Sequence, residues 1–189
     1  MKKITSLILL TLIIMLSLGS LSVYAEGESP NPKVYASNTT VTAGNTTYLY
    51  IYASDFVDVG AIDIYAFYDP EVFTITNSWV AGMAYGQQTS INTSTPGEAC
   101  FSILSLDGLN GSGALFEIAL RANSNAPAGS YNFVLAVGDA YNTSLEPISV
   151  GVSSPKITVN SRTTPQKSLS VYNSGNNYYY TYYTKFFLY

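Results

Sequence analysis

Apolar and polar positions alternate on both sides of Pro70, and this is the most informative pattern in the chain. Within residues 61–68 every second side chain falls on one face, whereas Asp63 falls on the opposite face. Pro70 has no N–H to donate to a strand ladder, so the chain turns there before the alternation resumes at residues 71–75. The pattern predicts a β-corner, at which the chain passes between two packed sheets. The apolar face of the first strand comprises Ile62, Ile64, Ala66 and Tyr68.

Short runs of this kind recur along the chain, separated by turns rich in Gly, Pro, Asn and Asp. After residue 25 no segment shows a sustained helical period with caps. The sequence therefore predicts an all-β domain of nine strands in two stacked sheets. The expected strands span residues 33–37, 46–53, 61–68, 71–77, 88–93, 99–106, 113–122, 130–137 and 155–160.

The same alternation predicts the core. Burying about a dozen such side chains, at roughly 1.5–3 kcal/mol each, offsets much of the ordering entropy without a disulfide or a metal. Besides Ile62 and Ile64, the expected core comprises Leu49, Ile51, Phe116, Ile118, Leu120, Phe133, Leu135 and Val137.

The first 25 residues have the pattern of an export signal. Lys2 and Lys3 are followed by an apolar run over residues 4–21 and by the small-residue cleavage pattern of residues 23–25. A retained membrane anchor is the alternative, but the run is short for a full span. We expect a secreted or cell-surface protein that meets the membrane only through this cleaved signal peptide, with a linker at residues 26–32 and one domain at residues 33–160.

Composition narrows the choice of partner. Loss of the two signal lysines leaves 6 of the 8 basic residues against 12 acidic ones, a net charge of −6. Such a chain is not expected to bind nucleic acid. Charged residues make up only 11% of the chain and there are 17 tyrosines, which is typical of an exposed extracellular β-protein.

The C-terminal segment differs from the domain. Residues 161–177 are polar and residues 178–189 are almost wholly aromatic and Thr. We expect residues 161–189 to form a polar linker and a Tyr-rich tail outside the sandwich, disordered or truncated. The alternative is a β-segment that binds a surface or another chain, because its β-propensity is high and its charge low.

No catalytic or metal-binding pattern emerges. The chain contains no histidine, so Cys100 lacks the neighbouring base that a nucleophilic thiol needs, and we expect it to be a small buried hydrophobic residue. Asp55 and Asp58 show no spacing of a calcium loop. We predict a protein that is not an enzyme and has no cofactor or metal of its own. Glycoside hydrolysis needs a pair of catalytic carboxylates, and the candidate acidic residues of the domain show no recognisable pattern of such a pair. These candidates are Asp55, Asp58, Asp63, Asp69, Glu71, Glu98 and Asp107.

Five phrases in a fixed order resemble the cohesin domain family. They are VTAGNTTYLYIYA, GAIDIYAFYDPEVFTI, ACFSILSLDG, GSGALFEIALRANSNAPAGSYNFVLAV and the closing strand SPKITV. Together they cover most of residues 33–160. The resemblance implies a nine-stranded jelly-roll β-sandwich, of the type shared by cohesins and carbohydrate-binding modules. It also implies a role in holding a dockerin-bearing protein, with calcium on the dockerin and not on this chain, in extracellular polysaccharide degradation.

The resemblance also indicates a binding face. In type I cohesins an Asn and an Asp just before the corner bind the dockerin helix; here Asp63 matches the Asp, whereas Ala61 replaces the Asn. Ile103 and Leu106 fall near contact positions of the next binding strand. From the residues themselves, Asp63, Tyr65 and Phe67 project together from one strand, which suits a helical partner better than a reaction.

Three tyrosines support a second hypothesis. Tyr48, Tyr50 and Tyr52 alternate along one strand, so their rings are roughly 6.5–7 Å apart on one face. Such a strip is suited to stacking against sugar rings, as in a carbohydrate-binding or adhesion module that contacts glycan directly. Plain β-propensity of tyrosine explains the same pattern without any ligand.

Overall fold

The computed structural model describes residues 31–162, 166–174 and 177–185, and these are mostly β-strands. The only helical element in the described part is a single 3-10 turn, η1 (Gly82–Ala84). The predicted all-β sandwich is confirmed. The strands are β1 (Lys33–Ala36), β2 (Thr39–Thr42), β3 (Thr46–Phe67), β4 (Phe73–Val80), β5 (Gln88–Asn92), β6 (Glu98–Ala122), β7 (Gly129–Asn132), β8 (Val134–Asn142), β9 (Gly151–Ser153), β10 (Lys156–Asn160), β11 (Gln166–Ser174) and β12 (Asn177–Lys185).

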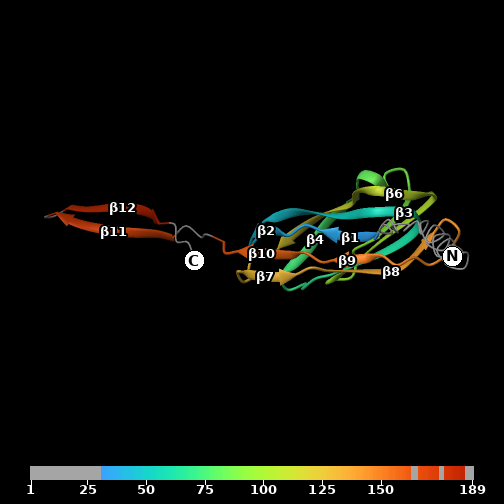
Figure 1. Cartoon of the computed structure of the whole chain (residues 1–189). Helices are drawn as coiled ribbons and strands as arrows, with labels where there is room; N and C mark the ends of the chain where they lie inside the picture. Colours follow the sequence, from blue (N-terminus) through green and yellow to red (C-terminus); the bar gives the residue numbers. More distant parts are fainter. Residues whose placement is uncertain (1–30, 163–165, 175–176, 186–189) are drawn as a thin grey trace, which may run out of the picture.

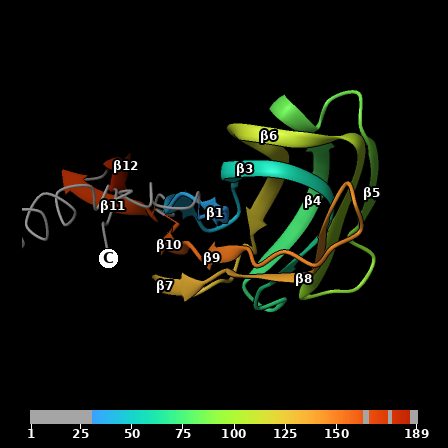
Figure 2. The ribbon, with the colours of Figure 1, turned by 45° about the vertical axis from the view of Figure 1, so that its right-hand side comes forward.

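Two long, bent strands build both layers of the sandwich. β3 and β6 pair with each other along both of their halves and curve around the core (Figure 2). The C-terminal half of β3 and the N-terminal half of β6 lie between β8 and β5, and we call these four strands the first layer. The other halves lie between β1 and β4, with β9 beyond β1, and form the second layer.

The bend in β3 explains why two predicted strands, residues 46–53 and 61–68, are one element. The pairing of β3 with β6 shifts register several times between Ile51 and Ala61. Asp55 and Asp58 take left-handed φ values of 54° and 52° inside this stretch. Aspartate tolerates that conformation better than most residues, so the ladder bends without ending. Residues 99–106 and 113–122 likewise merge into β6.

The core lies between the inner faces of the two layers. Phe101 of the first layer and Phe116 of the second meet there, with ring centroids 5.0 Å apart. Buried positions are odd-numbered before the bend of β3 and even-numbered after it, so each half presents its apolar residues inward. Most of the predicted core is confirmed, and Val137 is only partly buried against it. The fully buried predicted residues are Leu49, Ile51, Ile62, Ile64, Phe116, Ile118, Leu120, Phe133 and Leu135.

The edge strands are more divided than the sequence predicts. The predicted strand at residues 130–137 is split into β7 and β8, and two short strands that were not predicted, β2 and β9, lie beside the predicted runs at residues 33–37 and 155–160. β2 and β10 join β7 in a small sheet of order β2-β10-β7 at one end of the sandwich (Figure 1). Side chains bridge the breaks: Asn38 Oδ1 accepts the Lys156 N–H at 2.8 Å, and Ser154 Oγ accepts the Leu135 N–H at 2.9 Å.

The β-corner at Pro70 is confirmed. Asp69 Oδ1 accepts the backbone N–H of Glu71 at 2.9 Å, and the Asp69 carbonyl accepts the N–H of Phe73 at 2.9 Å. After this turn β4 pairs with residues 116–122 of β6, in the second layer. The chain therefore crosses from the first layer to the second at this point.

The C-terminal segment, expected to be disordered or truncated with a β-segment as the alternative, contains a hairpin. β11 and β12 pair in register from Gln166 with Lys185 to Ser174 with Asn177, and form a sheet of their own. The expected export signal lies outside the described residues. Within the described residues, no helix has the length and apolar character needed to cross a membrane.

Candidate functional site

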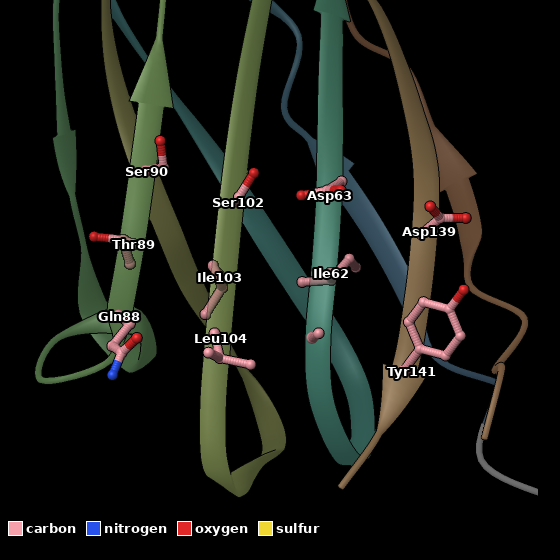
Figure 3. A pocket seen from close by; sticks show the side chains of 11 residues that line it. Ile62, Asp63, Gln88, Thr89, Ser90, Ser102, Ile103, Leu104, Asp139 and Tyr141 are labelled. Carbon is pink, nitrogen blue, oxygen red and sulfur yellow. The ribbon is translucent and has the colours of Figure 1, made fainter. Parts of the chain in front are cut away.

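The outer face of the first layer carries a polar row that crosses all four strands. Ser90 of β5 pairs with Ser102 of β6, and Ser102 pairs with Asp63 of β3. Asp139 of β8 continues the row beside Asp63, at a register shift between β3 and β8 (Figure 3). The row therefore ends in two carboxylates that lie on adjacent strands.

A hollow of about 450 Å³ lies along this row. One side of it is formed by a second row, in which Ala61 lies between Leu104 of β6 and Tyr141 of β8. The methyl group of Ala61 leaves open a central position that a longer side chain would fill. The replacement of Asn by Ala61, noted in the sequence, thus has a structural consequence. This face is hollowed at its centre rather than flat.

The hollow is acidic. Asp63 is half-buried and Asp139 is exposed, and none of the described lysine or arginine residues lines the hollow. A complementary surface would carry positive charge, either Lys and Arg side chains or the N-terminus of a helix. The carboxylates lie side by side on one surface and not across a cleft (Figure 3). They lack the arrangement in which two acids flank a glycosidic bond.

Two aromatic rings extend the face beyond Asp63. Tyr65 and Phe67 have ring centroids 6.3 Å apart and planes inclined by 10°, and Phe67 is 41% exposed. The Tyr65 ring lies against Gly138 of β8, where an added Cβ would come within 2.8 Å of Cε2. The pKa of Tyr65 is raised above its ordinary value of 10.0, first by its electrostatic interaction with Cys100 and then by Asp63. The predicted grouping of Asp63, Tyr65 and Phe67 on one outer surface agrees with the structure.

Ile103 does not belong to this surface, and that expectation is corrected. Its side chain is only 3% exposed and packs into the core. Positions 103 and 106 differ by an odd number, so a regular strand places them on opposite faces. The outward neighbours are Ser102 and Leu104, and the latter is 43% exposed.

An apolar patch adjoins the hollow at one end of the layer. Leu106, predicted from the sequence, is 80% exposed, and so is Leu145 in the turn after β8. Leu145 has a left-handed φ of 62°, a costly conformation for a leucine, and one that is typical of functional loops. A smaller hollow between them, of about 90 Å³, is lined by Ser105, whose buried hydroxyl has no hydrogen-bond partner within the described part of the chain. Sequence reasoning missed Leu145, although an isolated leucine in a polar turn was the available indication.

The tyrosine strip lies on the outer face of the second layer. Tyr48 is 57% exposed, whereas Tyr50 and Tyr52 are half-buried. Tyr52 stacks on Tyr35 of β1, with centroids 5.3 Å apart and planes inclined by 20°, so one of its faces is covered. The three rings therefore do not form the continuous flat strip expected from the alternation. Tyr48 instead lies 6.4 Å from Trp79 of β4, centroid to centroid.

Metal ligands are not clustered in the described part of the chain, since no group of three or more His, Cys, Asp or Glu side chains there is placed to hold an ion. The acidic residues of the β3 bend have local roles. The Asp58 carboxylate accepts hydrogen bonds from Thr143 Oγ1 at 2.8 and 3.0 Å, and Asp55 accepts one from the Ser54 hydroxyl at 2.7 Å. The Asp58 side chain thereby ties the β3 bend to the turn that contains Leu145, whereas the Asp55 side chain bonds only its neighbour in the chain.

Solved structures with the same architecture are cohesins. A non-cellulosomal cohesin from the archaeon Archaeoglobus fulgidus superposes with a TM-score of 0.62 at 14% identity, covering 68% of this chain and 91% of that one. The fold is that of a cohesin. A type I cohesin of Pseudobacteroides cellulosolvens matches with a TM-score of 0.61 at 16% identity, over 71% of this chain and 95% of that one. No family model and no curated protein matches the chain.

A further cohesin fold was solved with its partner bound. This type I cohesin–dockerin complex from Clostridium thermocellum matches with a TM-score of 0.63 at 11% identity, over 68% of this chain and 99% of that one. At identities this low, the structural similarity establishes the fold alone. The ligand of this chain has to be argued from its own residues.

Proposed function

We propose that the chain is an exported, non-catalytic binding module that holds a dockerin-bearing partner, in a system that degrades polysaccharide outside the cell. The observation that carries the proposal is the acidic, hollowed outer face of the first layer on a cohesin fold. Structures of the same fold are described as complexes with dockerins. The export pattern of residues 1–25 supports an extracellular setting.

The face itself indicates what the partner must present. A helix laid across the four strands would place an apolar side chain in the hollow over Ala61, between Leu104 and Tyr141. A basic side chain or the helix N-terminus would meet the Asp63 and Asp139 carboxylates. An apolar anchor at the end of the helix would cover Leu106 and Leu145, which are otherwise costly to expose.

Binding and not catalysis is the role that fits this face. Asp63 and Asp139 lie on adjacent strands of one surface, and the chain has no histidine to act as a base. A hollow flanked by exposed leucines offers places for the few anchors that carry most of the energy of a protein interface, and the two carboxylates add charge complementarity.

The test is a binding titration against a panel of purified dockerins, run with and without calcium. We expect Asp63→Ala to weaken binding about tenfold or more without changing the unfolding midpoint, because the side chain is half-buried on the outer surface. Ala61→Trp should abolish binding by filling the hollow. Tyr48→Ala, on the other layer, is the matched control and should bind normally. Unchanged affinity in both first-layer variants would refute the choice of face, and no binding to any dockerin would refute the partner.

A further inference from the structure

The outer face of the second layer contains a trough with aromatic walls. Within the trough the central strand β6 contributes Glu117, and small side chains flank it along the strand, because Ala114 pairs with Tyr52 and Ala119 with Tyr48. Tyr48 of β3 stands on one side, and on the other stands Trp79 of β4, which pairs with Glu117. The volume of the trough is about 620 Å³, and it is lined by Tyr48, Trp79, Val80, Tyr85 and Glu117.

The rings of the trough are open to solvent. The exposed fractions of the three side chains are 57% for Tyr48, 41% for Trp79 and 68% for Tyr85. Three large aromatic residues from three separate segments, β3, β4 and the turn after η1, converge on one hollow. Tryptophan and tyrosine exposed together in this way are typical of a binding site and uncommon on a free surface.

The polar group in the trough is an acceptor. Glu117 is half-exposed and pairs with Tyr50 across the β3–β6 ladder, and its carboxylate is the main cause of the raised pKa of Tyr50. An ionised carboxylate offers several acceptor positions and no donor, so Glu117 can accept hydroxyl groups from a ligand. Among the residues that the structure describes, no lysine or arginine lines the trough, which disfavours phosphates and other anions.

We propose that this trough binds a neutral polysaccharide chain, with sugar rings stacked on Trp79 and Tyr48 and hydroxyl groups hydrogen-bonded to Glu117. A sugar ring has an apolar face and a rim of hydroxyls, so it matches an aromatic wall beside a carboxylate. The volume falls within the range of sites for ligands larger than a single ring. A quaternary ammonium group, which also binds aromatic cages, is much smaller and needs rings that enclose it.

The two proposed sites are separate surfaces. Asp63 and the hollow over Ala61 lie on the outer face of the first layer, whereas Trp79 and Glu117 lie on the outer face of the second. The inner faces of the two layers pack on each other through Phe101 and Phe116. Their outer faces therefore point away from each other, and glycan binding does not depend on the dockerin proposal.

The experiment is calorimetric titration of the full chain with cellohexaose, xylohexaose and mannohexaose, with choline as a fourth ligand. We expect at least one hexasaccharide to bind, and Trp79→Ala to weaken it about tenfold or more, which is typical of losing a stacking ring. Glu117→Gln keeps the shape of the trough and should weaken binding less. Phe67→Ala removes an exposed ring from the first layer and is the matched control, which should bind normally.

The outcomes separate the alternatives. Thermal unfolding of each variant verifies that the fold is kept, and Tyr48→Ala provides a second test if Trp79→Ala fails to fold. Binding of choline alone, binding of no hexasaccharide, or equal affinity in the wild type and the Trp79 and Tyr48 variants would each overturn the proposal. A wild-type chain that binds a hexasaccharide but no dockerin would refute the proposed dockerin-binding function and leave the proposed polysaccharide site standing.

Discussion

Replacing Gly138 by alanine tests the outer face of the first layer without touching a contact residue. The added Cβ would lie 2.8 Å from Cε2 and 3.5 Å from Cδ2 of Tyr65. Carbon atoms in ordinary contact are about 3.5–4.0 Å apart, so the near edge of the ring must move by roughly 0.7 Å or more. The obstructing atoms belong to the end of a side chain and not to the backbone, so the ring moves and the strand stays in place.

The magnitudes predict a change in affinity with little change in stability. Moving the Tyr65 ring off its rotamer costs about 0.5–1.5 kcal/mol. Gly138 does not have a left-handed φ, so alanine also stiffens the unfolded chain and returns about 0.4–1 kcal/mol. The free energy of unfolding should therefore change by less than about 1 kcal/mol. Displacing an interface aromatic costs about 1–2 kcal/mol of binding, or roughly 5- to 30-fold in Kd.

The assay pairs urea unfolding with dockerin titration on the same protein preparation. Gly113→Ala is the matched control, because a Cβ there meets Met83 Sδ at an ordinary 3.5 Å on the other layer. This control should keep both its stability and its partner affinity. A folded Gly138→Ala variant that binds as tightly as the wild type would refute a role for Tyr65. A loss of several kcal/mol in stability would show instead that the ring cannot move.

Two further predictions concern stability. Ile103→Ala should lower the free energy of unfolding by about 2–5 kcal/mol, because Ile103 is buried in the core. Leu104→Ala, one position away on the outer face, should change it by less than about 1 kcal/mol. Equal losses of the two variants in urea unfolding would contradict the assigned faces. The pKa values of Tyr50 and Tyr65 are raised, so the folded chain holds their protons more tightly than the unfolded chain does. The stability that these two protonated tyrosines contribute is complete below pH 10.0 and is lost as the pH rises through their folded-state pKa values. Glu117→Gln should lower the Tyr50 pKa and so make this loss of stability shallower, as measured by urea unfolding at increasing alkaline pH. If the variant and the wild type lose stability with pH in the same way, Glu117 is not the cause of the raised Tyr50 pKa.

Much of the fold was predictable because alternation is a local property. The β-corner at Pro70 and nearly all of the core follow from the period of two and from the missing N–H of proline. The continuity of β3 was not predictable. Its bend depends on Asp55 and Asp58 adopting left-handed φ values while cross-strand pairing to β6 continues, and that pairing is formed with residues about 50 positions away.

The candidate site was predictable strand by strand but not across strands. Asp63, Tyr65 and Phe67 share a face because they alternate along one strand. The expectation for Ile103, which came from the family resemblance, was wrong because Ile103 has the parity of the inner face. Asp139 joins the site only through the register shift between β3 and β8. Trp79 joins the aromatic trough only because β4 returns beside β6 after the corner. Neither pairing is encoded in a local pattern.

The bend of β3 links the two proposed functions. Outward-facing positions are even-numbered at Tyr48, Tyr50 and Tyr52 and odd-numbered at Asp63 and Tyr65, so one strand presents aromatic residues on one face of the sandwich and an acidic group on the other. A strand without the register shifts between Ile51 and Ala61 would place one of these sets in the core. The bulged segment therefore allows a domain of this size to display two opposed surfaces, and a partner on one surface would leave the other free to hold a polysaccharide.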